Sequence, residues 1–255
     1  MNDTSNIDPR TPTPRTALVT GGGRGLGAAL GRDLARRGVA VVLVARTASE
    51  VDAVAERIRA DGGVAHALAF DVADKDAIHR IAALAADKVG PIDLLVHNAS
   101  ALGPVPMPIL LDTECEDFSA VLETNLVGPL RLTKAIGGGM VVRKRGTIVF
   151  VSSDAAVSAY PNWGAYGVSK AAADHMARTL AAELEGQGVG VFAFDPGEMD
   201  TVMHKAALPD ADPATLERPE RVARVLADLL LGARGDMASG DRVLASAHLA
   251  REEAA

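Results

Sequence analysis

The chain has 255 residues, a formal net charge of −7 at pH 7 and a sequence pI near 5.4. This length accommodates one large α/β domain with a substantial core. The chain is acidic and has no stripe of Lys and Arg residues that could displace the counterions of a nucleic acid. We therefore expect no nucleic-acid partner.

A few further features of the composition indicate the compartment. Cys115 is the only cysteine, which excludes an internal disulfide and is typical of a reducing compartment. No stretch approaches the ~20 apolar residues of a membrane span. Residues 1–15 contain three prolines among polar residues and predict a disordered tail without the apolar core of a signal peptide. We therefore expect a cytoplasmic protein with no membrane association.

The first elements of the chain predict a strand, a glycine-rich turn and a helix. The run from Thr16 to Thr20 is typical of a short buried strand, and Gly21-Gly-Gly-Arg-Gly-Leu-Gly27 follows at once. An alanine- and leucine-rich segment then predicts a helix to about Arg37. Glycines in such a turn let the backbone approach a pyrophosphate, and the helix N-terminus adds a favourable dipole. The spacing departs from the common Gly-x-Gly-x-x-Gly, so the string alone also fits an ordinary turn, but its position favours a dinucleotide.

Strand and helix signals alternate along the rest of the chain. The predicted strands are 40–45, 64–70, 92–97, 146–151 and 189–194, with 242–245 closing the sheet. The predicted helices are 49–60, 75–88, 117–143, a helix carrying Tyr166 to about 185, and 219–231. Continuous apolar strands separated by helices predict a doubly wound parallel sheet, a three-layer αβα Rossmann fold, as one domain over residues 16–255. The ligand is then expected at the carboxyl ends of the strands.

The predicted helix 117–143 contains two unusual features. Pro129 follows Asn125 by four residues and has no N–H to donate to the Asn125 carbonyl. We therefore predict a kinked helix that passes through both residues, with the Asn125 oxygen facing Lys170. The alternative is a helix that begins near Asn125, where a proline in the first turn is tolerated. The glycines 137–139 are expected to loosen this helix or end it early, at roughly 1 kcal/mol each relative to alanine.

The residues that predict proton transfer lie between 153 and 170. Ser153 precedes Tyr166 by 13 residues, and Lys170 follows Tyr166 by four. Residues at i and i+4 share a helix face, and a nearby cation favours the phenolate, so we expect Lys170 to lower the tyrosine pKa from near ~10. Such a tyrosine exchanges a proton with a carbonyl or alcohol oxygen that Ser153 holds. Taken alone, the spacing also fits a solvated helix face with a structural tyrosine.

Several motifs occur in one order along the chain. They are Thr20-Gly-Gly-Gly-Arg-Gly-Leu-Gly27, Asp71-Val72, Asn98-Ala99, Asn125, Ser152-Ser153, Tyr166-x-x-x-Lys170 and Pro196-Gly197 with Thr201. Together they resemble the short-chain dehydrogenase/reductase family over roughly residues 16–243. The resemblance implies a catalytic tetrad of Asn125, Ser153, Tyr166 and Lys170, in which Lys170 also contacts the ribose and Asn125 supports a water relay. It also implies a homodimer or homotetramer.

The same resemblance assigns the residues that bind the dinucleotide. They are Gly21, Arg24, Gly25, Leu26, Gly27, Arg46, Asp71, Val72, Asn98, Lys170, Pro196, Gly197 and Thr201. Asp71 is assigned to the adenine, although a loop residue or a helix cap is the alternative. Ser100 stands where the family usually has glycine, which removes backbone freedom from that loop. The six histidines show no metal-ligand spacing, so we expect no metal.

The sequence favours NADP(H) over NAD(H). NAD-specific relatives carry an acidic residue at the end of the second strand, where this chain has Ala45 followed by Arg46. Arg24 and Arg46, without a nearby carboxylate, are expected to bind a 2′-phosphate. The alternative is that both arginines are solvated.

Two classes of function remain open. The first is an NADP(H)-dependent oxidoreductase that interconverts a carbonyl and a secondary alcohol of a small molecule. The second is a catalytically silent dinucleotide-binding sensor or scaffold, which has no need of the whole tetrad. Substrate specificity is expected from the loop after Thr201 and from residues around 101–107, 154–163 and 198–203. The apolar wall is predicted to consist of Tyr160, Trp163, Met199, Met203 and Leu208, with Glu198 and Asp200 at its edge. Fatty-acyl thioesters, steroids, sugars and small ketones all fit this pattern, in either reaction direction.

Overall fold

A parallel sheet forms the centre of the molecule in the computed structural model, which describes residues 15–232 and 237–253. The predicted tail therefore lies outside the described residues, apart from Arg15. Within the described ranges the sheet has seven strands in the order β3-β2-β1-β4-β5-β6-β7. They are β1 (Thr16–Thr20), β2 (Ala40–Ala45), β3 (Ala65–Ala69), β4 (Leu94–His97), β5 (Gly146–Val151), β6 (Val189–Asp195) and β7 (Arg242–Leu244).

The strands form because their apolar residues are covered on both faces. All five residues of β1 and all four of β4 are buried. Residues 17–19 of β1 pair in parallel with residues 94–96 of β4, and β1 pairs with β2 on its other side. The strand order reverses at the β1–β4 pair, and in open α/β sheets the crevice beside such a reversal is where ligands bind.

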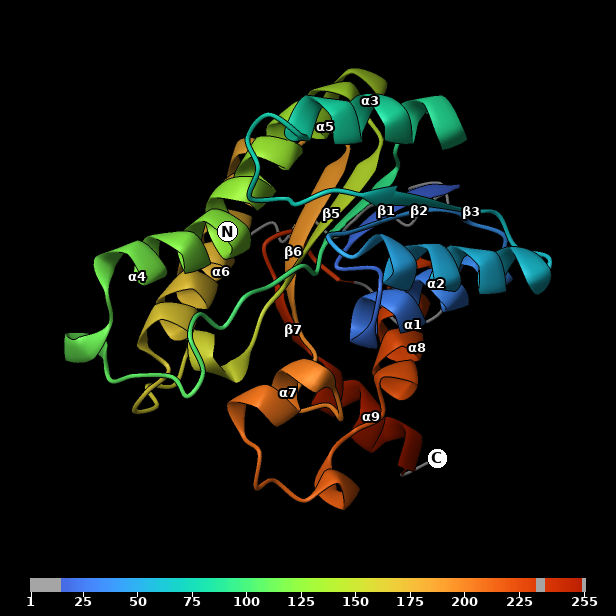
Figure 1. The fold of residues 1–255 in the computed structure, drawn as a ribbon. Helices are drawn as coiled ribbons and strands as arrows, with labels where there is room; N and C mark the ends of the chain where they lie inside the picture. Colours follow the sequence, from blue (N-terminus) through green and yellow to red (C-terminus); the bar gives the residue numbers. More distant parts are fainter. Residues whose placement is uncertain (1–14, 233–236, 254–255) are drawn as a thin grey trace.

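Helices cover both faces of the sheet (Figure 1). Apolar side chains of α1, α2, α8 and α9 pack on one face, and those of α3, α5 (Gly128–Arg143) and α6 pack on the other. The bounds are α1 (Gly25–Arg36), α2 (Ala48–Ala60), α3 (Ile78–Val89), α6 (Gly164–Glu183), α7 (Val202–Ala207), α8 (Pro219–Leu230) and α9 (Ala245–Glu253). The predicted three-layer Rossmann fold is confirmed. The sequence did not predict α9, and it assigned Ala245 to the last strand.

The predicted helix 117–143 is continuous but has three parts. It consists of α4 (Cys115–Leu122), a π-helical turn (Glu123–Val127) and α5 (Gly128–Arg143). The N–H of Gly128 donates to the carbonyl of Glu123, five residues earlier, so the hydrogen-bond register widens next to Pro129. The helix passes through Asn125 and Pro129, and the alternative start near Asn125 is wrong. The predicted kink and carbonyl direction stay predictions.

The glycines 137–139 do not end α5, which continues to Arg143. The expected early end of the helix is wrong because of tertiary packing, whereas the expected loosening stays a prediction. Leu132, Ile136 and Met140 are buried against the sheet, and burial of this face compensates for the low helix propensity of glycine.

Candidate active site

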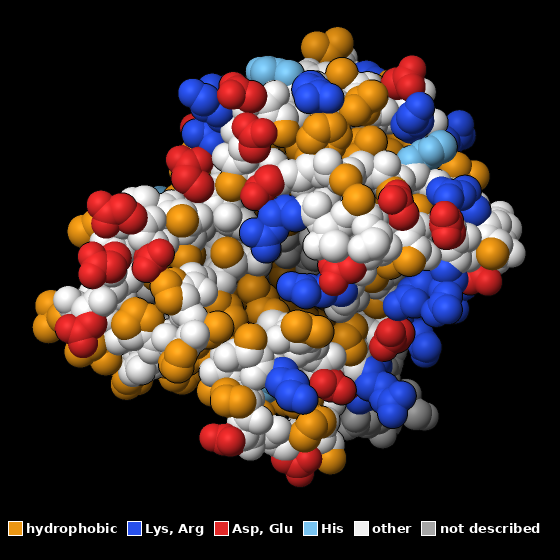
Figure 2. Space-filling view, viewed as in Figure 1, with side chains coloured by type: hydrophobic (Ala, Val, Ile, Leu, Met, Phe, Trp, Pro, Cys, Tyr) orange, Lys and Arg blue, Asp and Glu red, His pale blue; other side chains and the backbone are white. Residues whose placement is uncertain are grey.

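A cavity of about 980 Å³ lies at the carboxyl ends of the central strands. Its lining residues follow β1, β2, β4, β5 and β6, and α7 and the start of α8 complete its wall. Figure 2 shows a hollow on this face, flanked by Lys and Arg side chains. Most of the predicted site residues line the cavity: Gly21, Arg24, Gly25, Leu26, Arg46, Asp71, Val72, Asn98, Ser153, Tyr166, Lys170, Pro196, Gly197 and Thr201. Gly27 and Asn125 do not line it.

The glycine turn between β1 and α1 has a shape that side chains would block. Gly21 and Gly25 have φ angles of +66° and +53°, which L side chains rarely adopt. A Cβ at Gly27 would lie 2.3 Å from the Gly21 carbonyl oxygen, so Gly27 acts by close packing beneath the turn. The side chain of Arg24, the N-cap residue of α1, makes no capping hydrogen bond with a described residue. The N–H groups at the start of α1 and the open turn fit a pyrophosphate.

Asn98 and Thr20 hold the loop after β4 against this turn. The Asn98 amide donates to the carbonyls of Thr20 and Gly21 at 2.9 and 3.2 Å. The Thr20 hydroxyl accepts the N–H groups of Asn98 and Ala99, each at 3.0 Å. Asn98 therefore shapes the glycine turn as well as lining the cavity, a structural role that the sequence did not predict.

The two arginines expected to bind a 2′-phosphate both line the cavity, but a carboxylate lies beside one of them. Arg24 Nη1 is 3.7 Å from Glu50 Oε1, and both side chains are substantially exposed. The expectation that no carboxylate lies nearby is wrong. The reason is that α2 begins directly after β2, so Glu50 in its first turn reaches back over the glycine turn. Arg24 therefore has a carboxylate partner beside the cavity.

Asp71 combines the two interpretations left open by the sequence. It lines the cavity beside Val72, and its Oδ1 accepts the Ala73 N–H at 2.9 Å. This contact is an Asx turn, a local structural role. The turn uses only Oδ1 of the carboxylate, and a ligand contact by Asp71 stays a proposal.

Ser153, Tyr166 and Lys170 meet at one end of the cavity. Ser153 follows β5, whereas Tyr166 and Lys170 lie one turn apart on α6 and are nearly fully buried. Lys170 Nζ is 5.4 Å from the centroid of the Tyr166 ring and donates to the Val151 carbonyl at 2.7 Å. The Trp163 ring meets the Tyr166 ring edge-on, at 5.6 Å between centroids. The predicted proximity of these three side chains is present.

The pKa of Tyr166 does not follow the sequence-based expectation. Burial raises the pKa of the phenol from 10.0 to about 12, while its hydrogen bond with Ser153 lowers it. The carboxylates of Asp195 and Asp154 raise it further, and a hydrogen bond with Ser100 lowers it. The expectation of a lowered pKa is wrong for this structure, because removal from water penalises the phenolate. Tyr166 is therefore protonated at neutral pH.

Burial acts on Lys170 in the opposite direction. It lowers the pKa of the ammonium from 10.5 to about 8, although the carboxylates of Asp174 and Asp195 oppose the change. Burial raises the free energy of the charged form relative to the neutral form, for a cation as well as for an anion. Lys170 therefore changes charge within the range in which enzymes are assayed.

Asn125 is buried behind the cavity and fixes two elements of its wall. Its Oδ1 accepts the Ala101 N–H at 2.7 Å and the Ser100 hydroxyl at 3.3 Å. Its Nδ2 donates to the Ala101 carbonyl and to the Ser169 hydroxyl, each at 2.9 Å. The side chain thus joins the loop after β4 to α6. Ser100 does not adopt a positive φ, so this loop needs no glycine there.

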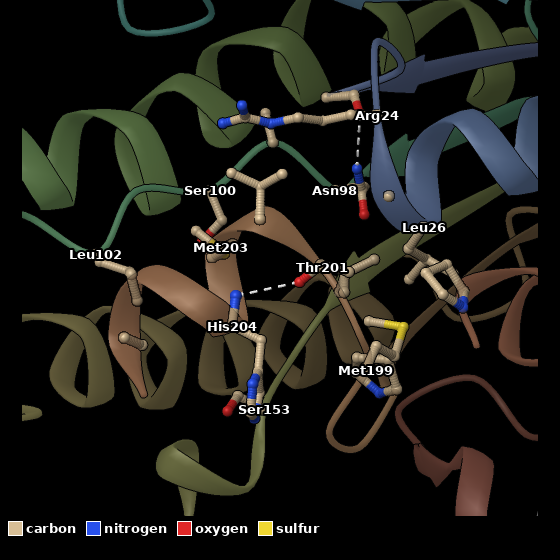
Figure 3. A pocket seen from close by; sticks show the side chains of 18 of the residues that line it. Arg24, Leu26, Asn98, Ser100, Leu102, Ser153, Met199, Thr201, Met203 and His204 are labelled. Carbon is tan, nitrogen blue, oxygen red and sulfur yellow. Dashed lines mark hydrogen bonds between the residues drawn. The ribbon is translucent and has the colours of Figure 1, made fainter. Parts of the chain in front are cut away.

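The remaining wall comes from the segment after β6 (Figure 3). Gly197 has a φ of +70°, and its N–H donates to Asp195 Oδ1 at 2.9 Å. Thr201 caps α7 by accepting the His204 N–H at 3.1 Å, and its methyl lies against Gly25. Leu102 and His204 also line the cavity. Both lie in segments that the sequence assigned to substrate specificity, residues 101–107 and the loop after Thr201, although it did not name these two residues. His204 follows the Thr201 cap by one helical turn, the signal that could have placed it.

The predicted apolar wall is partly present. Trp163, Met199 and Met203 line the cavity, and so do the predicted edge residues Glu198 and Asp200. Tyr160 and Leu208 do not line it. The Tyr160 hydroxyl instead donates to Asp154 Oδ2 at 2.8 Å from an exposed loop.

The described part of the chain holds no group of three or more His, Cys, Asp or Glu side chains that could bind a metal ion. In residues 15–232 and 237–253, every helix is too short or too polar to span a bilayer.

Comparison with known proteins relates this site to a family. A family model described as short chain dehydrogenase matches residues 15–212. A short chain dehydrogenase of Pseudocercospora fijiensis is 39% identical over 192 residues, which span 73% of this chain and 60% of that protein. A 3-oxoacyl-(acyl-carrier-protein) reductase of Synechocystis sp. is 37% identical over 192 residues, spanning 75% of this chain and 76% of that protein. The crystal structure of a metagenomic short-chain oxidoreductase in complex with NADP aligns with a TM-score of 0.76 and 31% identity, covering 90% of this chain and 96% of that one.

Proposed function

Because the chain belongs to the short-chain dehydrogenase/reductase family of oxidoreductases, we propose that it interconverts a carbonyl and a secondary alcohol with NADP(H). One observation carries the proposal. Ser153, Tyr166 and Lys170 line the same cavity as the glycine turn that fits a pyrophosphate. Proton-transfer groups and a dinucleotide cradle in one cavity are what hydride exchange at a carbonyl carbon requires.

The chain's own residues hold the reactants. The glycine turn and the N-terminus of α1 bind the pyrophosphate, and Arg24 and Arg46 bind the 2′-phosphate. When bound, the dinucleotide supplies or accepts the hydride. The Ser153 hydroxyl orients the substrate oxygen, and the phenol of Tyr166 donates a proton to it. The ammonium of Lys170, 5.4 Å from the Tyr166 ring, stabilises the negative charge that develops on the phenol oxygen.

The state of Tyr166 suits the step in which a carbonyl is reduced. With a pKa raised to about 12, the phenol carries its proton at neutral pH and can donate it to the carbonyl oxygen. Trp163, Met199 and Met203 line the same cavity as this proton donor, so we propose a carbonyl substrate with an apolar body.

The direct test is turnover by the purified 255-residue chain. Loss of the ultraviolet absorbance of NADPH is followed with a panel of ketones, steroids, sugars and acyl thioesters. We expect consumption of NADPH that depends on at least one carbonyl substrate. Tight NADPH binding without turnover across the panel would instead favour the silent sensor.

Cofactor preference gives a prediction for Glu50. We expect kcat/KM to favour NADPH over NADH by about tenfold or more, which corresponds to ~1.4 kcal/mol from arginine–phosphate pairing. Glu50→Gln should increase this ratio by about threefold, because it frees Arg24 from its carboxylate. Glu56→Gln makes the same charge change on an exposed part of α2 that does not line the cavity, and should leave the ratio unchanged. A preference for NADH in the wild type would contradict the assignment.

The pH profile gives a prediction for Lys170. Its pKa is lowered from 10.5 to about 8, so the cation is present below pH 8 and is lost as the pH rises through that value. Since the cation stabilises the developing phenolate, kcat/KM for reduction should fall as the pH increases above about 8. The measurement is kcat/KM with NADPH between pH 6 and 10. A rate that stays constant up to pH 10 would rule out this role of Lys170.

A further inference from the structure

Arg242 joins three segments of the site from the last strand of the sheet. Its Nη2 donates to the Ser153 carbonyl at 2.9 Å and to Asp195 Oδ2 at 2.7 Å. Its Nε donates to Asp174 Oδ2 at 3.0 Å. The guanidinium therefore uses its fixed fork of donors to connect the end of β5, the helix α6 and the end of β6.

Each contact of Arg242 lies next to a group of the proposed machinery. Ser153 carries the hydroxyl that orients the substrate oxygen. Asp174 lies one turn after Lys170 on α6. Asp195 precedes Pro196, and its second carboxylate oxygen accepts the N–H of Gly197 at 2.9 Å. A shift of Arg242 would thus displace the Ser153 hydroxyl and the Asp195–Gly197 turn on the cofactor side. It would also change the electrostatic environment of Lys170.

The charges around Arg242 are nearly buried. The side chains of Asp174 and Asp195 are 4% and 8% exposed, and that of Arg242 is 19% exposed. Asp174 Oδ1 has no hydrogen-bond partner among the described residues. Arg242 forms an ion pair with both carboxylates, and breaking such a buried pair leaves uncompensated charge beside the site.

We propose that Arg242 is a positioning residue for the reaction: it fixes the Ser153 backbone and the Asp195–Gly197 turn relative to α6, and it neutralises two carboxylates beside Lys170. The inference rests on the proposed function. Arg242 lies 72 residues after Lys170 in the sequence and outside every motif of the family resemblance. It acts through Ser153, Lys170 and Gly197.

A second arginine in the chain provides a matched control. Arg37 binds two carboxylates in a comparable way, with Nη2 2.7 Å from Asp33 Oδ2 and Nη1 2.6 Å from Asp228 Oδ1. It joins α1 to α8 and does not line the cavity. Arg37→Met and Arg242→Met should therefore lower the free energy of unfolding to a similar extent. Only Arg242→Met should also lower kcat.

The experiment compares both variants with the wild type at a temperature where all are folded. We expect Arg242→Met to lower kcat at least about thirtyfold with KM for the carbonyl changed less than about threefold, and Arg37→Met to keep kcat within about twofold. Arg242→Lys should give an intermediate kcat, because an ammonium restores the charge but cannot reach all three acceptors.

The pH profile separates positioning from simple destabilisation. The charged groups that act on Lys170 are Asp174 from its own helix and Asp195 from the end of β6, and the Tyr166 ring lies beside it. Without Arg242 these carboxylates favour the ammonium more strongly, so the falling limb of kcat/KM should move to higher pH. In the double variant Arg242→Met/Asp174→Asn, the falling limb of kcat/KM should return to lower pH.

Hydrogen exchange provides a readout that needs no turnover. In Arg242→Met we expect faster amide exchange in residues 152–157 and 195–198, and in Arg37→Met no change there. A wild type without turnover would overturn the proposed function. In that case amide exchange alone would test whether Arg242 positions these segments. Unchanged exchange in these two segments, or equal kcat in the two methionine variants, would overturn the inference about Arg242.

Discussion

Tyr166→Phe is expected to lower kcat at least about a thousandfold, within the range that a general acid contributes. The substitution removes only the phenolic proton donor and keeps the buried ring that meets Trp163 and Lys170. The affinity for NADPH and the melting temperature should therefore stay close to those of the wild type. The measurements are steady-state kinetics, NADPH fluorescence titration and thermal unfolding.

The control for Tyr166 is the other tyrosine of the chain. The hydroxyl of Tyr160 also donates to a side chain, Asp154, but Tyr160 does not line the cavity. Tyr160→Phe should keep kcat within about threefold, since an exposed hydrogen bond contributes little to the transition state. If Tyr166→Phe retained activity within about tenfold of the wild type, the proton-transfer role of Tyr166 would be wrong.

Gly27→Ala is expected to raise the dissociation constant for NADPH at least about a hundredfold, or ~2.7 kcal/mol. The new Cβ would lie 2.3 Å from the Gly21 carbonyl oxygen and 2.5 Å from Asn98 Nδ2. Both contacts are too short to keep, so the glycine turn must move away from the position that receives the pyrophosphate. Overpacking of this kind should also destabilise the fold by about 1–3 kcal/mol.

Gly138→Ala provides the matched control for Gly27→Ala. Gly138 lies in α5 without a positive φ, and a Cβ there meets nothing within 4 Å. Alanine should stabilise the helix by up to about 1 kcal/mol and leave NADPH binding unchanged. Wild-type affinity for NADPH in Gly27→Ala would show that the turn can relax without losing its ligand.

Part of the site could be predicted because its signals are local. The run 16–27 places strand, turn and helix next to one another in the sequence, and the spacing of Tyr166 and Lys170 is set by one helical turn. Asp71, Asn98, Ser153 and Gly197 each follow a strand, and parallel strands bring their carboxyl ends to one edge of the sheet. The positions of these residues at the cavity therefore followed from the pattern of strands and helices.

Predictions about charge were less successful, because they depend on distances between segments. Glu50 was not expected beside Arg24, since the two are separated by β2 in the sequence and meet only where α2 turns back. Lys170 was expected to lower the pKa of Tyr166, but the extent of burial decided the sign. Residue spacing predicts neither the distance between Arg24 and Glu50 nor the burial of Tyr166.

The sequence by itself determined the order of strands and helices, the glycine turn and the residue types of the proton-transfer site, because apolar periodicity and i,i+4 spacing act within single elements. Only the tertiary structure decided that α5 continues through the glycines 137–139, that Asn125 joins a loop to α6, and that Arg242 reaches Ser153, Asp174 and Asp195. These features arise from packing between segments far apart in the chain. Burial there changes the free energies of charge and of helix formation by as much as the local propensities themselves.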